Sequence, residues 1–180
     1  MRTASLDGAP VRTGSGLRLA ADGSLADAPR PHTLLVPGGD GTRDPDPRLV
    51  GWLRVHAPRA ERLVSVCTGA VLLARAGLLD GRRATTHWLA MDELKEHGAE
   101  PTGERVVLDG KYVTAAGVSS GIDMGLHLVG RIAGDRHAQT VQLLTEYDPR
   151  PPYDAGSPDK APAEIVAFWR AAASRPPAAG

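Results

Sequence analysis

The residue with the clearest chemical potential in this chain is its one cysteine, Cys67. It follows a short apolar run, Leu63 to Val66, and stands directly before Thr68, Gly69 and a series of good helix formers. A thiol at a turn between a strand and a helix lies at the carboxyl end of the strand, where open α/β sheets bind ligands. The helix N-terminus also favours a thiolate. The pattern predicts a nucleophile at Cys67, and a buried structural cysteine is the alternative.

The segments around this turn predict the sheet that positions it. Compact apolar runs at Thr33–Val36, Leu63–Val66 and Lys111–Thr114 indicate its central strands. Asp109-Gly110 is a strong turn signal, and it predicts a hairpin between Arg105–Leu108 and the last of these strands. Helical patterns separate the other strands. Strands that alternate with helices predict an α/β fold with a parallel sheet.

Two further segments could complete a site around the thiol. The loop after Thr33–Val36 contains Gly38 and Gly39, and its glycines allow a backbone N–H to face a ligand. Thr68 could donate its N–H or hydroxyl to developing charge, or it could satisfy its own helix. His87 follows a short strand and could act as an acid or base, or it could be a capping or core histidine.

Composition excludes several classes of function. The 21 Lys and Arg residues balance the 21 Asp and Glu residues, so we expect no basic face for nucleic acid. One cysteine excludes an internal disulfide and fits a reducing cytoplasm. No signal peptide and no run long enough to span a membrane is visible. The histidines lack metal-ligand spacing, so we expect no metal. We expect one domain over residues 1–173 and a tail over 174–180.

Three segments resemble a known family. They are Leu-Leu-Val-Pro-Gly-Gly at 34–39, Ser-Val-Cys-Thr-Gly-Ala at 65–70, and Ala-Gly-Leu-Leu-Asp-Gly-Arg-Arg-Ala-Thr-Thr-His-Trp at 76–88. This pattern is similar to that of the ThiJ/PfpI superfamily, which has the class I glutamine amidotransferase-like fold. The resemblance implies a three-layer flavodoxin-like sandwich with a mainly parallel central sheet. It also implies a homodimer, because members are commonly dimers.

The segment Glu146–Pro158 resembles the isonitrile hydratases in particular. The residue after the cysteine agrees, since these hydratases carry Thr there, whereas protease- and deglycase-type members usually carry His. The resemblance implies a small-molecule substrate, an isonitrile, which the cysteine helps to hydrate to an N-substituted formamide. That chemistry requires no cofactor.

The same resemblance implies the roles of the site residues. Cys67 and Thr68 are the expected catalytic residues. Gly38, Gly39 and His87 are expected to bind the substrate or stabilise an oxyanion.

One departure from the family pattern favours a different interpretation. Superfamily members normally begin with a strand and a helix that supply an inner strand and an acid touching the nucleophile, and this chain begins at what resembles the second strand. We expect a unit of about 30 residues to be missing, and hydration to be weak or absent as a result. The alternative is a non-catalytic sensor or pseudoenzyme related to the ligand-binding domain of AraC-type regulators, which share the Cys-Thr-Gly-Ala and Thr-Thr-His-Trp segments.

Overall fold

The computed structural model of the protein describes residues 1–173, so the expected tail at 174–180 lies outside the described residues. The chain forms two compact units, Met1–Met124 and Gly125 to the end of the chain. The first contains every predicted site residue. Close packing within each unit does not decide whether they fold together, so the single domain over 1–173 stays a prediction.

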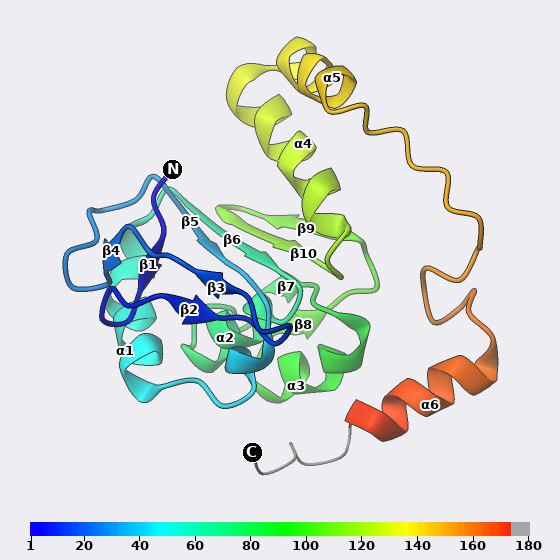
Figure 1. Ribbon diagram of the computed structural model, residues 1–180, viewed down its shortest axis with the longest axis horizontal. Helices are drawn as coiled ribbons and strands as arrows, with labels where there is room; N and C mark the ends of the chain where they lie inside the picture. Colours follow the sequence, from blue (N-terminus) through cyan, green and yellow to red (C-terminus); the bar gives the residue numbers. More distant parts are fainter. Residues whose placement is uncertain (174–180) are drawn as a thin grey trace. The chain divides into compact units, whose positions relative to one another are not determined.

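A four-stranded sheet forms the centre of the first unit, as Figure 1 shows. Its strands, in spatial order, are β5 (Thr33–Val36), β6 (Arg62–Val66), β10 (Tyr112–Ala115) and β9 (Val106–Asp109). The first three run parallel, and β9 is antiparallel to β10 across the predicted turn. Each predicted strand is therefore confirmed, with ends shifted by at most one residue. The α/β class with a mainly parallel central sheet is also confirmed.

The register of this sheet brings the ends of its parallel strands together. Val36 is opposite Ser65, and Ala115 is opposite Val66. Because parallel strands end at the same edge, the loops after β5, β6 and β10 must leave the sheet side by side. This edge is the place at which Cys67 begins its turn.

Short strands complete the first unit outside the central sheet. They are β1 (Ala4–Ser5) with β4 (Gly23–Ser24), β2 (Val11–Arg12) with β3 (Arg18–Leu19), and β7 (Arg83–Ala84) with β8 (Glu100–Pro101). Strand β4 lies in a stretch of small and polar residues that carries no strand pattern of its own. Tertiary hydrogen bonds order it, because the Asp22 N–H donates to the Thr3 carbonyl at 2.9 Å and the Asp22 carboxylate accepts from the Thr3 N–H at 2.6 Å.

Helices α1 (Pro47–His56), α2 (Gly69–Arg75) and α3 (Met91–Glu96) share the apolar core of the first unit with the sheet and the connecting segments. Helix α1 begins at an Asp-Pro pair, which is typical of helix starts, with Pro47 in its first turn and the Asp46 carboxylate accepting from the Arg48 N–H at 2.8 Å. Leu53 and Leu94 pack with Leu63 of the sheet in this core.

Helix α4 (Ser120–Ala133) begins against the sheet. A Cβ at Gly121 would lie 3.2 Å from a methyl of Val66, and Met124 is buried. Two apolar residues of this helix are nevertheless exposed, Ile122 at 50% and Ile132 at 58%. The apolar face of α4 is therefore only partly covered.

The second unit consists of the rest of α4, helix α5 (Asp135–Leu144), an irregular proline-rich segment and helix α6 (Ala163–Ala173). Gly134 takes the capping position of α5, with φ of 89°, and Asp135 is its first helical residue. No helix within residues 1–173 is both long and apolar enough to cross a membrane.

Candidate functional site

Cys67 occupies a strained turn between β6 and α2. Its φ is 57°, and among the described residues only Glu146 shares a positive φ without being glycine. The Cys67 N–H points back to the β10 end and donates to the carbonyls of Ala115 at 3.0 Å and Ala116 at 2.8 Å. Cys67 is half-buried and not fully enclosed in the core.

The glycine loop after β5 lies directly against this turn. A Cβ placed on Gly38 would lie 2.8 Å from both the Cys67 Cβ and the Thr68 nitrogen, closer than real Cβ atoms approach. A Cβ on Gly69 would collide with the Val36 carbonyl oxygen. The two glycines therefore let the loop and the first turn of α2 approach as closely as they do.

Thr68 is hydrogen-bonded to Gly39 and not to its own helix. The Gly39 N–H donates to the Thr68 hydroxyl at 3.0 Å, and that hydroxyl makes no capping bond to α2. The alternative in which Thr68 only satisfies its own helix is therefore wrong. The Gly39 N–H is occupied by this bond, whereas the Thr68 N–H has no acceptor within residues 1–173. Of the two expected backbone donors, Thr68 is thus the one without a partner among the described residues.

His87 stands beside the third loop at this edge of the sheet. It precedes a short 3-10 helix, and its Nδ1 accepts from the Leu89 N–H at 3.4 Å, which is a long bond. Its ring packs close to Gly117, next to the Ala116 carbonyl that accepts from Cys67. Burial lowers the pKa of His87 below its usual value of 6.5, so the ring is neutral at pH 7.

Thr86 is a contact of the nucleophile to which the sequence analysis gave no role. Its hydroxyl donates to the Cys67 carbonyl at 2.8 Å. The only signal was the Thr-Thr pair before His87, whose residues are small, polar and, in the structure, buried. A partner nineteen positions away along the chain cannot be read from local pattern.

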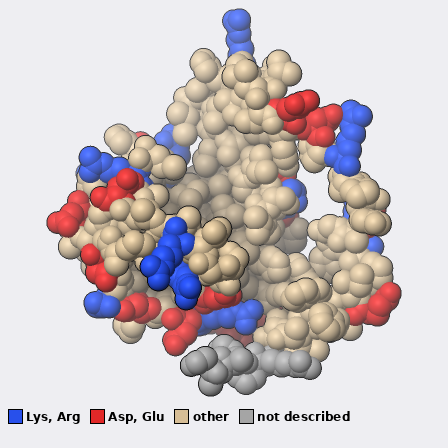
Figure 2. Space-filling view, in the orientation of Figure 1, with Lys and Arg blue, Asp and Glu red and all other residues tan. Residues whose placement is uncertain are grey.

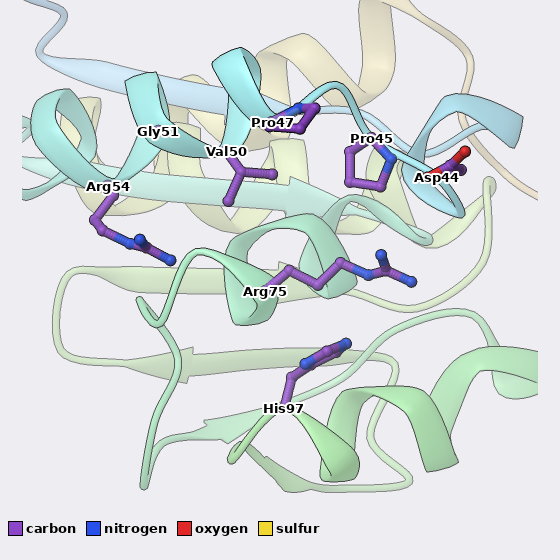
Figure 3. A pocket seen from close by; sticks show the side chains of 8 residues that line it. All are labelled: Asp44, Pro45, Pro47, Val50, Gly51, Arg54, Arg75 and His97. Carbon is purple, nitrogen blue, oxygen red and sulfur yellow. The ribbon is translucent and has the colours of Figure 1, made fainter.

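A separate hollow of about 440 Å³ contains none of the predicted site residues. Figure 3 shows its lining, from Asp44 and one face of α1 to Arg75 and His97. Arg75 stands at the opposite end of α2 from Cys67. The basic groups here already have structural partners, since Arg75 pairs with Glu93 at 2.6 Å and the Arg54 Nε donates to the Ala76 carbonyl at 3.3 Å.

Among the described residues, neither a patch of one charge nor a group of metal-binding side chains indicates a second site. On the face shown in Figure 2, basic and acidic side chains alternate without forming a patch of one sign. Paired examples are Arg105 with Asp123 and Arg83 with Glu104. Asp123, in the first turn of α4, thus belongs to an ion pair. Within the described part of the chain, no three His, Cys, Asp or Glu side chains form a group that could hold a metal ion.

Comparison with known proteins decides the family. The DJ-1/PfpI family model matches residues 1–131. The chain belongs to the DJ-1/PfpI family. It is 44% identical over 159 residues to the "Isonitrile hydratase" of Pseudomonas putida, a match that covers 87% of this chain and 70% of that protein. The resemblance to ThiJ/PfpI proteins inferred from the sequence is thereby confirmed.

The chain is also similar to transcriptional regulators and to a solved structure of the same family. The chain is 39% identical over 140 residues to the "HTH-type transcriptional regulator CdhR" of Pseudomonas aeruginosa, which covers 76% of this chain but only 42% of the regulator. Among solved structures, a ThiJ/PfpI family protein from Pseudomonas syringae superposes with a TM-score of 0.91 at 36% identity, covering 95% of this chain and 72% of that one. An AraC family transcriptional regulator from Pseudomonas putida superposes at 0.72 with 31% identity, covering 80% of each chain.

Proposed function

We propose that this DJ-1/PfpI protein hydrates isonitriles to N-substituted formamides, with Cys67 as the nucleophile. The observation that carries the proposal is the Cys67 turn, where a positive φ of 57° places the half-buried Cys67 beside the Thr68 N–H, which has no partner within residues 1–173. The 44% identity to a protein named isonitrile hydratase supports the choice of reaction. It does so over most of the chain, including all the proposed site residues.

The reaction balances with water as the only co-reactant. The Cys67 thiolate attacks the terminal carbon of R–N≡C, a carbon–sulfur bond forms, and a proton reaches the same carbon, which gives the thioimidate R–N=CH–S–Cys. Water then adds to that carbon. Breaking the carbon–sulfur bond returns the thiol and leaves R–NH–CHO.

The neighbouring groups have separate tasks in this sequence. The Thr68 N–H donates to the oxygen that gains charge when water adds. Gly38 lets its loop lie directly against Cys67 and Thr68 because it has no side chain. His87 is neutral at pH 7 because burial lowers its pKa, and since its Nδ1 accepts from the Leu89 N–H, its Nε2 carries the proton and can donate a hydrogen bond to the substrate or to the attacking water.

The test measures formamide and the covalent intermediate together. The protein and a Cys67→Ala variant are incubated with an alkyl isonitrile, formamide is quantified by NMR, and intact mass is recorded. We expect formamide above the uncatalysed background, and a mass increase of one isonitrile, only when Cys67 is present. Equal formamide formation with both proteins would contradict the proposal. Gly51→Ala, on the exposed side of α1, is the control for substitution itself.

A second candidate is a sensor that binds a small molecule without turning it over. The similarity to two transcriptional regulators favours it, as does the engagement of the Gly39 N–H by Thr68. The same samples distinguish the two functions. A sensor shows a ligand-induced rise in melting temperature with alkyl isonitrile that survives Cys67→Ala, and it forms no adduct and no formamide.

We also propose that the protein works as a cytoplasmic homodimer on a small-molecule substrate, without nucleic acid as a partner. A single cysteine suits a reducing compartment, and equal numbers of acidic and basic residues provide no field to attract nucleic acid. Light scattering at micromolar concentration tests the assembly, and a monomer would contradict it.

A further inference from the structure

The conformation of Cys67 has to be maintained by its surroundings. A residue with a side chain avoids positive φ, because its Cβ approaches the neighbouring carbonyl oxygen too closely. Such a conformation persists only where the surrounding structure over-determines it. The bonds made by the two peptide groups of Cys67 therefore matter for where its thiol points.

The N–H of Cys67 is held by backbone carbonyls, whereas the shorter of the two bonds to its carbonyl comes from a side chain. The N–H donates to the carbonyls of Ala115 and Ala116, at 3.0 and 2.8 Å. The carbonyl accepts from the Thr86 hydroxyl at 2.8 Å, while its other donor, the Ala70 N–H, is 3.4 Å away. The Thr86 bond is thus the short one on the side that leads into α2.

Thr86 is itself firmly placed. It is only 1% exposed, and the preceding residue is tied to the central sheet because the Thr85 N–H donates to the Thr114 hydroxyl at 2.9 Å. Because Thr86 is fixed to the sheet in this way, its hydroxyl can restrain the Cys67 carbonyl that it binds. A water molecule cannot easily replace the Thr86 hydroxyl, because the site is buried.

We infer that Thr86 is a positioning residue for Cys67, whose hydroxyl holds the Cys67 peptide in its left-handed conformation and so aims the thiol at the Gly38 loop. Without that hydroxyl the peptide relaxes toward an ordinary φ, and the thiol leaves its place beside the Thr68 N–H. The catalytic role of Thr86 rests on the proposed hydration, but its effect on the thiol can be measured without any isonitrile.

The experiment measures alkylation of Cys67 by iodoacetamide, followed by intact mass. The chain has one cysteine, so every adduct reports on this thiol. Thr86→Val removes the hydroxyl at nearly constant volume, and Thr86→Ser retains it. We expect Thr86→Val to slow alkylation at pH 7 by about fivefold or more, the equivalent of one hydrogen bond, and Thr86→Ser to stay within about twofold of the wild type.

Ser5→Ala is the matched control. The Ser5 hydroxyl is also largely buried and also donates to a backbone carbonyl, that of Ala9, at 2.7 Å, but it lies in β1, outside the Cys67 turn. It should leave the alkylation rate unchanged whatever it does to stability. Should Thr86→Val fail to fold, Thr86→Ala is compared with Thr86→Ser in its place.

Two results would overturn the inference: wild-type alkylation in the variant that lacks the hydroxyl, or equal slowing in Thr86→Ser. Failure of the proposed function would look different. In that case isonitrile would give no formamide and no adduct with the wild type, while the alkylation rates would still separate Thr86→Val from Thr86→Ser.

Discussion

At the scale of single residues, Cys67 combines a reactive side chain with an unfavourable backbone. Left-handed φ costs a residue with a Cβ about 1–2 kcal/mol, and glycine avoids most of this cost. The structure therefore predicts that the thiol is retained at the expense of stability. Active sites commonly store strain in this way, and the strain here is an observed φ of 57°.

Two substitutions that remove the thiol of Cys67 should reveal this strain. Cys67→Gly and Cys67→Ala both eliminate the thiol, but only glycine relieves the left-handed conformation. We expect the Gly variant to have the higher free energy of unfolding, by about 1 kcal/mol in urea denaturation. A more stable Ala variant would show that the turn is not strained.

His87 should make the free energy of unfolding depend on pH. Burial lowers its folded-state pKa below 6.5, so between that folded value and 6.5 the unfolded chain binds more protons than the folded one. The free energy of unfolding must then fall as pH drops from about 6.5 through the folded pKa.

The corresponding variant is His87→Asn, whose side-chain oxygen can replace Nδ1 as the acceptor for the Leu89 N–H. We expect its free energy of unfolding to decrease less between pH 7 and pH 5 than that of the wild type. His137→Asn, on the exposed surface of α5, should retain the wild-type slope. Equal slopes in all three proteins would exclude His87 as the source.

At the scale of elements, the site depends on how closely α2 approaches the end of β5. Gly69 has no room for a side chain, because a Cβ there would overlap the Val36 carbonyl oxygen. Backbone, unlike a flexible side chain, cannot move aside locally. The helix and the strand would have to separate, and the Gly38 loop would move with them.

Gly69→Ala should therefore destabilise the fold and slow alkylation of Cys67, even though alanine is the better helix former. Overpacking of this kind typically costs about 1–3 kcal/mol. The matched control is Gly51→Ala in α1, where a new Cβ meets no atom within 4 Å, and it should gain about 0.5–1 kcal/mol. Chemical denaturation measures both. A neutral Gly69→Ala would show that the helix shifts freely.

At the scale of the whole molecule, strand β5 leaves one edge of the central sheet open. The Arg62 N–H donates to the His32 carbonyl, so alternate residues of β5 face β6, and the peptide groups of Thr33 and Leu35 face away. No other strand within residues 1–173 pairs with that edge. Leu35 is also 50% exposed, and an apolar open edge promotes pairing with another chain.

Leu35→Lys should therefore reduce self-association, because a charge on an edge strand opposes edge-to-edge pairing. Val55→Lys is the control, since Val55 is a similarly exposed apolar residue, at 55%, but lies on α1. Light scattering at several micromolar concentrations should show a lower mean mass for Leu35→Lys only. The same mass for both variants would rule out the β5 edge as the contact.

Much of this molecule was determined by local sequence. Apolar runs marked the strands, Asp109-Gly110 marked the hairpin, and Asp46-Pro47 marked the start of α1. The position of Cys67 between a strand and a helix was also correct. These features were predictable because turn chemistry, capping and period act over a few residues.

Tertiary structure alone decided how the site is held. The bond from Thr86 to Cys67 joins residues 19 apart, and the bond from Gly39 to Thr68 joins residues 29 apart. Neither leaves a local trace, because Thr and Gly serve many roles in loops. The strand at Gly23–Ser24 and the open edge of β5 depend in the same way on partners that only the folded chain provides or withholds. Local pattern thus predicted which residue could react, whereas long-range packing determined its conformation, its neighbours and which of its expected donors is available.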